Sequence, residues 1–337
     1  MADDPEDTIC QVVEARALWF TGLRQAALRP AFVPSLRPPD ALLVRAVVSG
    51  ISRGTEALVF QGLVPDSERL RMRCPFQAGA FPFPVKYGYA MVGIVEDGPA
   101  ERIGETVLCL HPHQTHFAVP CDAAFRVPPE TTAQRAVLAP QMETALNALW
   151  DAAPRVGDRI AVIGGGVIGC LVAYLCAGMP GCSVILIDPD ESRRRIAEAL
   201  GIAFARPDET LPGNNDLVFH TSGTANGLQM ALSLAGFEAS VIEMSWHGAA
   251  LVQVPLGAAF HSQRLLLRSS QVGMVAPDRR ARWDRARRLA LALSLTADPR
   301  LDVLLDTPVL FEDLPEALPG ILGQAGALCV RIIYPEN

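Results

Sequence analysis

The spacing of apolar residues along the chain changes near residue 135. Before that point apolar residues form short runs, as at 42–48 and 106–110, and glycine or proline separates the runs. Runs of this length between turn-forming residues are typical of β-strands. Over 135–150 the apolar residues recur at helical spacing instead. The pattern therefore predicts a β-rich domain over residues 1–150 that ends in a helix.

The next part of the chain alternates strand-like and helical segments. Strands are expected at 159–163, 183–187, 216–219, 239–244 and 264–267, with helices at 167–177, 192–200 and 225–234. Such alternation builds βαβ units, in which helices cover both faces of a parallel sheet. We therefore expect an α/β doubly wound domain over residues 151–275. The remainder, 276–337, begins with a helix from about Trp283 and continues as short strands near Val309 and 327–333.

Length and composition limit the classes of protein and partner. The 337 residues suffice for two domains, and half of them are hydrophobic. The net charge of −7 argues against a nucleic-acid partner, which needs a basic face. Arginines are dense only over 279–288, where the interleaved alanines favour a solvated helix face over an anion site.

The sequence also gives an expectation for compartment. No apolar run reaches the length of a membrane span, and residues 1–7 are too acidic for a signal peptide. The eight cysteines, Cys10 among them, form no C-x-x-C pair, which favours free thiols in a reducing compartment. We expect a cytoplasmic protein that acts on a small molecule, away from membranes.

A glycine-rich turn joins the first strand of the α/β segment to its first helix. It reads Gly164-Gly-Gly166-Val167-Ile168-Gly169, which is the pattern G-x-G-x-x-G. The first glycine permits a tight turn, the second lets backbone amides approach a pyrophosphate, and the third lets the helix pack on the strand. The positive end of the helix dipole then faces the phosphates. The turn predicts a dinucleotide site.

The end of the next strand bears on the choice of dinucleotide. Asp188 follows the apolar run 183–187, where an acidic side chain accepts hydrogen bonds from the adenosine ribose. A carboxylate repels a 2′-phosphate, which favours NAD(H) over NADP(H). Arg193, Arg194 and Arg195 follow, and one of them could pair with such a phosphate instead of lying on a solvated helix face. We expect NAD(H), with NADP(H) as the alternative.

The carboxyl ends of the later strands are expected to surround the nicotinamide. In a doubly wound sheet, ligands bind in the crevice outside these strand ends. An ordinary turn or helix cap would use the same residue types. The candidates are Ser222, Gly223, Ser245, Trp246, Ser269 and Ser270.

Several segments resemble the medium-chain dehydrogenase/reductase family. Residues 43–56 (LVRAVVSGISRGTE) resemble the family's V-x-A-x-G-(I/V)-C-x-(S/T)-D, 88–95 (GYAMVGIV) its G-H-E-x-x-G-x-V, and 104–107 (GETV) its G-D-R-V. The stretch SGISRGTE is most similar to the subgroup related to hydroxyethyl-bacteriochlorophyllide dehydrogenase. The resemblance implies a GroES-like β domain, completed by the C-terminal residues, around an inserted Rossmann domain. It also implies a homodimer that pairs along the nucleotide sheet, for which the apolar stretch 249–256 is available.

The zinc positions of the family are altered in this chain. Ser52 stands at the cysteine ligand, Tyr89 at the histidine ligand and Ala90 at the adjacent glutamate. Near the third ligand only Glu143 is a carboxylate, and it is out of register. Zinc requires three or four cysteine, histidine or carboxylate ligands around one point. We therefore expect no metal and a zinc-independent member of the family.

Another group must then handle the proton of an alcohol or carbonyl substrate. Tyr89 is expected to face the cleft, and the cation of Lys86 nearby would make its hydroxyl a general acid. The resemblance places His111 in the pocket beside the nicotinamide, as a second candidate donor. His113 and His116 complete a pattern that could suggest a metal, although no carboxylate or cysteine accompanies them.

The loop that begins at Ser52 has further candidate roles by resemblance. Ser52 and Thr55 correspond to a zinc ligand and a proton-relay hydroxyl. Arg53 corresponds to a position that reaches the cofactor pyrophosphate, and Glu56 to the acidic residue that orients the loop. The alternative for each is a loop residue that satisfies local backbone groups.

These features together predict an oxidoreductase. The expected reaction is hydride transfer between a nicotinamide cofactor and a carbonyl/alcohol substrate. One alternative is reduction of an activated C=C bond, as in enoyl and quinone reductases. The other is a non-catalytic protein that binds a dinucleotide.

Overall fold

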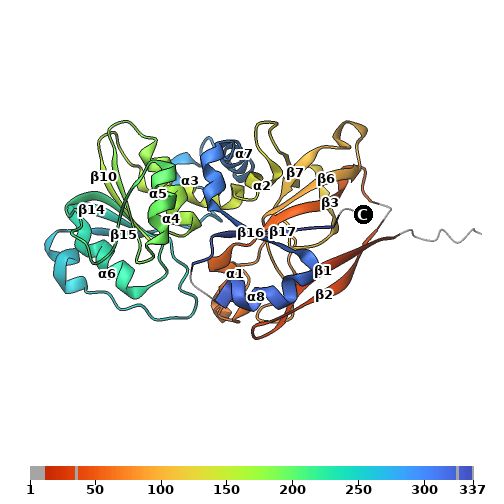
Figure 1. The fold of residues 1–337 in the computed structure, drawn as a ribbon, viewed down its shortest axis with the longest axis horizontal. Coiled ribbons are helices and arrows are strands. Elements are labelled where there is room, and N and C mark those ends of the chain that lie inside the picture. The colour runs from red at the N-terminus through yellow and green to blue at the C-terminus, as the bar shows by residue number, and fades with distance from the viewer. Residues whose placement is uncertain (1–11, 35–36, 324–325, 336–337) are drawn as a thin grey trace, which may run out of the picture.

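The chain forms two lobes that lie side by side, as Figure 1 shows. The structure is a computed structural model that describes residues 12–34, 37–323 and 326–335. One lobe is built mainly of strands from the first part of the chain, and the other is the α/β segment. The acidic stretch 1–7 and Cys10, which were interpreted above, lie outside the described residues. Within the described residues no helix is long and apolar enough to cross a membrane.

The β lobe contains two sheets, and the end of the chain completes one of them. The larger sheet has seven strands, and its order begins with the C-terminal strands β16 and β17. Strand β17 pairs antiparallel with β3, so the C-terminal segment returns to the first lobe. The larger sheet comprises β16 (Leu305–Leu310), β17 (Cys329–Ile333), β3 (Ala41–Gly50), β6 (Met91–Asp97), β7 (Thr106–Cys109), β9 (Ala124–Arg126) and β8 (His116–Pro120). The smaller comprises β2 (Gln25–Pro34), β1 (Val12–Gly22), β5 (Val85–Lys86) and β4 (Ala78–Gly79).

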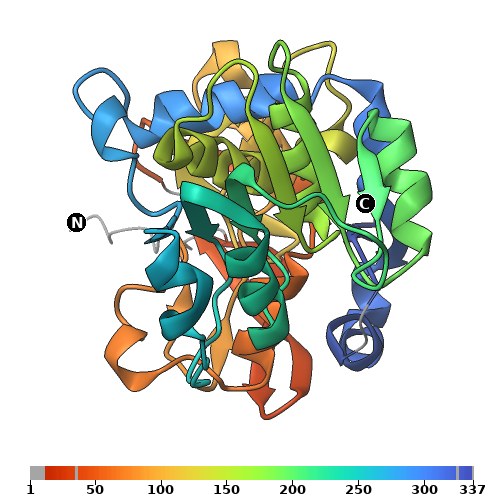
Figure 2. The same cartoon turned by 90° about the vertical axis from the view of Figure 1, so that its left-hand side faces the viewer.

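The α/β lobe is a six-stranded parallel sheet in which the strand order reverses at β10. The order is β12-β11-β10-β13-β14-β15, and every neighbouring pair is parallel. The strands are β10 (Arg159–Ile163), β11 (Ser183–Ile187), β12 (Ala203–Ala205), β13 (Asn215–His220), β14 (Ala235–Glu243) and β15 (Leu266–Ser269). The helices are α4 (Val167–Ala177), α5 (Ser192–Leu200) and α6 (Ala225–Leu234). Figure 2 shows this sheet with its helices from the side of the α/β lobe.

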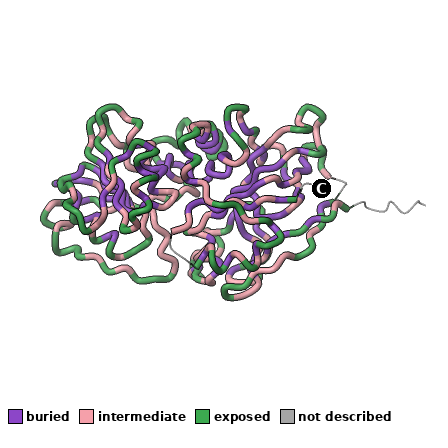
Figure 3. The backbone as a smooth tube through the Cα atoms, in the orientation of Figure 1, coloured by how far each residue is buried: buried purple, intermediate pink, exposed green. Residues whose placement is uncertain are grey.

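Helices cover both faces of this sheet because successive side chains of a strand point to opposite sides. On β10, Ile160 and Val162 belong to the cluster that contains the residues of α4, whereas Ala161 and Ile163 belong to the cluster that contains those of α6. Buried residues concentrate along the sheets of both lobes in Figure 3. The predicted α/β fold with a doubly wound parallel sheet is confirmed.

A helix between the lobes joins their cores. Helix α3 (Ala139–Ala152) packs against α4 and α7 (Arg285–Leu295), and its cluster includes Val92 of the β lobe and Ile160 of the α/β lobe. The helical pattern expected over 135–150 is divided in the structure, because α2 (Ala133–Ala136) ends before α3 begins at Ala139, with Pro140 in the first turn of α3. The domain boundaries near 150 and 275 stay predictions.

Two expectations about the later part of the chain are wrong. The stretch 249–256 contains Pro255 and is irregular, so it does not form the edge of the sheet, which is β15. The arginine-rich run is not a solvated face throughout, because Arg288 is fully buried. Its guanidinium donates to Oε1 of Glu143 at 2.9 Å and to Oδ1 of Asn147 at 2.5 Å, which anchors α7 to α3.

Candidate active site

The glycine turn has the backbone geometry that a pyrophosphate site requires. Gly164 has a φ of +109°, which favours glycine, and a Cβ on Gly169 would lie 1.8 Å from the carbonyl oxygen of Gly164. Gly166 is the N-cap of α4, and a Cβ there would meet nothing within 4 Å. Gly164 and Gly169 are therefore required by packing, whereas the space beside Gly166 is left for a ligand.

A cleft at this turn is shared by the two lobes. Val167 and Ile168 line it together with the glycines from the α/β side, and the loop at the start of α1 (Arg53–Phe60) lines it from the β side. Its lining consists of Ile51, Ser52, Arg53, Gly54, Gln141, Gly166, Val167, Ile168, Gly169, Thr221, Ala327 and Leu328. The cleft therefore brings the predicted pyrophosphate site and the predicted proton-relay loop to one place.

Charged groups gather at the end of β11. The carboxylate of Asp188 accepts hydrogen bonds from the backbone N–H of Gly165 at 2.6 Å and of Asp190 at 2.8 Å. Arg193 lies against this turn and donates to the carbonyl of Gly326. The pKa of the Arg53 guanidinium is lowered by burial and by the positive charge of Arg193. Two positive side chains therefore lie close to the turn, a setting that suits an anionic ligand.

The interpretation of the three arginines as one solvated helix face is wrong for Arg193. Its residue surface is only 6% exposed, because its side chain packs against Gly165 of the glycine turn. Arg194 does lie at the surface, where it pairs with Glu191 and Glu209, and Arg195 is exposed.

Tyr89 and Ser52 form a hydroxyl pair beside the cleft. The Tyr89 hydroxyl donates to Oγ of Ser52 at 2.5 Å. Ser52 is the N-cap of α1, and its backbone N–H donates to Oε1 of Glu56 at 2.8 Å, so the glutamate in the first turn holds the loop in place. Burial raises the pKa of Tyr89 to about 12, and hydrogen bonds with Ser52 and Thr55 oppose that rise. The tyrosine is therefore protonated near neutral pH and able to donate.

The cation expected beside Tyr89 and the second candidate donor are placed differently. Lys86 donates to Oε1 of Gln114 at 2.6 Å, and burial lowers its pKa. His111 is buried, stacks on Phe117 at 4.1 Å between ring centroids and donates from Nδ1 to the Pro112 carbonyl at 2.8 Å. Burial and the charge of Lys86 lower the pKa of His111 to about 3. His111 is therefore neutral near pH 7 and is a poorer proton source than Tyr89.

The depressed pKa of His111 predicts a specific loss of stability in mild acid. In the unfolded chain the pKa of His111 returns to near 6.5, so this side chain binds a proton below about pH 6.5. In the folded protein His111 stays unprotonated down to about pH 3. The free energy of unfolding should then fall by up to about 1.4 kcal/mol per pH unit in that window. His111→Phe keeps the stacking and removes the titration. Urea unfolding at about pH 7 and about pH 5 should show a smaller acid loss in the variant; an equal loss would contradict the assignment.

A buried polar chain behind the hydroxyl pair was not predicted. Nε2 of His113 lies 3.3 Å from the carboxylate of Glu56, and Nδ1 lies 2.8 Å from Oγ of Ser49. That hydroxyl lies 2.9 Å from the hydroxyl of Tyr334 in the C-terminal segment. Ser49 lies in the segment 43–56 that resembles the family, but neither it nor Tyr334 was assigned a role from the sequence. This row of hydrogen-bonded side chains holds Glu56 in place, and Glu56 in turn holds the loop at Ser52.

The residues that correspond to the zinc ligands of medium-chain dehydrogenases do not fit a metal ion in this chain. The two residues at ligand positions offer only neutral hydroxyl oxygens, and these bond to each other. Glu143, the nearby carboxylate, is buried and paired with Arg288. His111, His113 and His116 do not converge either, since His116 faces Glu96 at 3.6 Å. Zinc prefers cysteine, histidine and ionised carboxylate ligands, which these residues do not supply.

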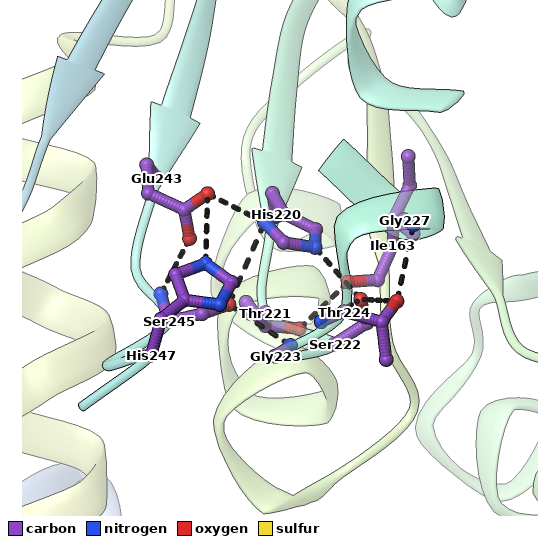
Figure 4. A network of polar contacts seen from close by, with 10 residues as sticks. All are labelled: Ile163, His220, Thr221, Ser222, Gly223, Thr224, Gly227, Glu243, Ser245 and His247. Atoms are coloured by element: carbon purple, nitrogen blue, oxygen red, sulfur yellow. Dashed lines mark hydrogen bonds and ion pairs between the residues drawn. The ribbon is translucent and has the colours of Figure 1, made fainter. Parts of the chain in front are cut away.

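Polar residues also meet at the ends of β13 and β14, as Figure 4 shows. Oγ of Ser245 accepts a hydrogen bond from the N–H of Gly223 at 3.0 Å, and Oγ of Ser222 lies 2.7 Å from Nε2 of His220. The structure therefore brings Ser222, Gly223 and Ser245 together, beside the unpredicted residues His220, Glu243 and His247.

The remaining candidates for the nicotinamide end lie close to this group, since the parallel register pairs Ser269 with Glu243 and the N–H of Ser270 donates to the Glu243 carbonyl at 3.0 Å, but their side chains make other contacts. Trp246 packs on the core of the β lobe. Ser269 is exposed at the end of the edge strand, and Ser270 donates to Asp151 at 2.7 Å. The proposed nicotinamide end thus rests on Ser222, Gly223 and Ser245.

Comparison with known proteins places these features on a known fold. No protein-family model matches the chain. It is 24% identical over 147 residues to 2-dehydro-3-deoxy-L-galactonate 5-dehydrogenase of Pseudoalteromonas atlantica, covering 41% of this chain and 43% of that protein. It is 27% identical over 206 residues to D-guloside 3-dehydrogenase of Escherichia coli, covering 57% and 59%. The matched segments therefore span about half the length of these curated relatives.

Solved structures match over nearly the whole chain. L-idonate 5-dehydrogenase from Escherichia coli superposes with a TM-score of 0.78 at 16% identity, over 96% of this chain and 99% of that one. 2R,3R-butanediol dehydrogenase from Bacillus subtilis gives 0.75 at 17% identity, over 96% and 100%. A short chain alcohol dehydrogenase from Escherichia coli, complexed with NADH, gives 0.74 at 15% identity, over 96% and 99%. This chain has the fold of these dehydrogenases. The GroES-like and Rossmann arrangement expected from the sequence is confirmed, and the bacteriochlorophyllide dehydrogenase subgroup stays a prediction.

Proposed function

We propose that this protein is a nicotinamide-dependent oxidoreductase that transfers a hydride between the cofactor and a carbonyl/alcohol substrate. The observation that carries the proposal is the shared cleft, in which the open face of Gly166 and the Ser52 loop line one space. A dinucleotide held at the turn and a substrate oxygen near Ser52 would then lie in the same cleft. The curated relatives that match part of the chain are named as dehydrogenases, which supports the same class of reaction.

Residues of both lobes are suited to hold the dinucleotide. The amides that begin α4 would bind the pyrophosphate, and the guanidinium of Arg53 would add a positive charge from the opposite wall. The carboxylate of Asp188 would accept from the adenosine ribose, for which we propose a preference for NAD(H). Arg193 beside it is the group that would favour NADP(H) instead. The bound nicotinamide would supply or accept the hydride.

The hydroxyl pair provides a route for the proton without a metal, and we propose that the chemical step is independent of zinc. Because Tyr89 donates to Oγ of Ser52, the proton of Ser52 is free to point elsewhere, and Ser52 lines the cleft. When a carbonyl is reduced, Ser52 would give its proton to the substrate oxygen and take the proton of Tyr89, and the tyrosinate would regain a proton from solvent. Alcohol oxidation would run the same transfers in reverse and would release a proton to solvent. Glu56 holds Ser52 in position through the backbone N–H.

Transfer of a labelled hydride tests this function. The protein should move deuterium from nicotinamide-deuterated NADH to a ketone, and polyol-derived ketones and keto sugar acids are the first to screen because the partial relatives act on sugar derivatives. Deuterium found only on the β-carbon of an enone would establish the C=C reductase alternative. Tight binding of the cofactor with no transfer to any substrate would establish the non-catalytic alternative and contradict the proposal.

We also propose a homodimer that pairs along the edge of the α/β sheet. Strand β15 is the edge strand. Leu266 on this strand is 54% exposed, and Phe237 on the neighbouring β14 is 65% exposed. An exposed strand edge with apolar side chains is a surface that a second copy can cover.

A further inference from the structure

Three side chains able to bind a metal ion meet at the carboxyl ends of two neighbouring strands. His220 is the last residue of β13 and Glu243 is the last of β14, and the parallel register pairs them directly. His247 follows four residues after Glu243, in the loop that leaves the strand. In Figure 4 both imidazole rings face the carboxylate. Within the described residues this is the one group of three such side chains with converging ligand atoms.

The distances are close to those that a bound ion needs. Oε2 of Glu243 lies 2.7 Å from Nδ1 of His220 and 3.7 Å from Nε2 of His247. One ligand atom of each residue lies within 4.8 Å of the other two. A tetrahedral zinc ion with bonds of about 2.0–2.1 Å keeps its ligand atoms roughly 3.3 Å apart. Small side-chain rotations would therefore bring the three atoms around one ion.

Neighbouring groups already hold the atoms that would not bind the ion. Oγ of Ser222 lies 2.7 Å from Nε2 of His220, and the N–H of Ser245 donates to Oε1 of Glu243 at 2.7 Å. Such outer contacts orient the ligands of protein metal sites. They leave Nδ1 of His220 and Oε2 of Glu243 directed at each other.

The third ligand atom supplies an independent observation. Nε2 of His247 is buried and has no hydrogen-bond partner among the described residues. An unsatisfied buried polar atom lowers the free energy of unfolding, typically by about 1–3 kcal/mol, so a bound partner at this atom would stabilise the protein. An ion between the rings would be that partner.

We propose that His220, Glu243 and His247 bind a divalent transition-metal ion of the Zn²⁺ type. Two imidazole nitrogens and one carboxylate oxygen suit Zn²⁺ and Co²⁺, whereas Mg²⁺ and Ca²⁺ prefer oxygen ligands. On binding, the ion takes Nδ1 of His220, and the ring proton resides on Nε2, where Ser222 accepts it. Three protein ligands leave a fourth position for water. Thr221, which follows His220 in sequence, is a lining residue of the cleft.

Metal titration of the untagged, chelator-stripped protein without cofactor tests the site independently of the proposed function. Calorimetry with Zn²⁺ should show one equivalent bound with micromolar or tighter affinity, and Co²⁺ should give the visible spectrum of a four-coordinate ion. His247→Gln should weaken Zn²⁺ binding by at least about 100-fold, since loss of a mere outer-shell partner already costs 10–100-fold. Should that variant fail to fold, Glu243→Gln should lower the affinity comparably.

Matched variants separate this site from other places where the ion could bind. His261→Gln changes an exposed histidine of the same lobe, and the affinity should not change. Ser52→Ala and Tyr89→Phe alter the family's zinc position, and they should leave the binding of Zn²⁺ intact. The proposal is overturned if the wild type binds no Zn²⁺. It is also overturned if binding survives both His247→Gln and Glu243→Gln, or is lost in Tyr89→Phe.

Discussion

Replacing Gly166 by valine should abolish dinucleotide binding and leave the fold intact. A Cβ at this position meets nothing within 4 Å, and the φ of −73° suits any residue, so the protein accommodates the side chain. The side chain would instead project into the cleft where backbone amides face the pyrophosphate. Loss of two charge-assisted hydrogen bonds at about 1.5–3 kcal/mol each corresponds to at least about 100-fold in affinity. Fluorescence titration with NADH and a thermal melt measure the two effects.

Two other glycines provide the controls for this prediction. Gly213→Val also adds a side chain into open space in the same lobe, away from the cleft, and both affinity and melting temperature should stay unchanged. Gly169→Ala should destabilise the fold itself, because its Cβ would overlap the carbonyl of Gly164. Unchanged NADH affinity in Gly166→Val would remove the glycine turn from the binding site.

Replacing Tyr89 by phenylalanine should lower kcat for carbonyl reduction by about 100-fold or more, the range for loss of a general acid. The ring and its edge contact with Tyr87 at 6.0 Å between centroids are retained, and only the hydroxyl that donates to Ser52 is lost. Binding of NADH should be unchanged, since the cofactor contacts lie at the glycine turn. Single-turnover hydride transfer measures the step directly.

The hydroxyl relay makes a second, sharper prediction. If Tyr89 and Ser52 act as one unit, Ser52→Ala should cost about as much as Tyr89→Phe, and the double variant should cost little more. Tyr174→Phe is the matched control, because its hydroxyl donates to Asp298 at 2.9 Å on the α/β lobe. A loss below about threefold in Tyr89→Phe would exclude Tyr89 as the general acid.

The features that follow from local sequence were predictable. Gly164 and Gly169 are required by contacts within the turn itself, so the motif is recognisable from its own residues. The structure has this turn between β10 and α4, as expected. Continuous apolar runs identified the buried parallel strands, since both faces of such a sheet are covered. Strand β15 begins at Leu266, two residues later than expected, because Arg264 adopts a left-handed φ of +54°.

Features that depend on distant partners were not predictable. Arg193 and Arg288 resemble surface arginines in sequence, and they are buried only because Gly326 and Glu143 come from elsewhere in the chain. The group of His220 and Glu243 is an intermediate case. Both residues end apolar strands, so parallel register alone would have placed them side by side.

Titration of the wild-type, metal-free protein with NADH and NADPH, followed by fluorescence, decides whether the cleft binds a nicotinamide dinucleotide. We expect micromolar binding of NADH and much weaker binding of NADPH, since the carboxylate of Asp188 lies at the turn. Tighter binding of NADPH would contradict the role of Asp188 and would indicate that Arg193 binds the 2′-phosphate of the adenosine ribose. Binding of neither dinucleotide would contradict the assignment of the cleft as a cofactor site, and with it the proposed oxidoreductase.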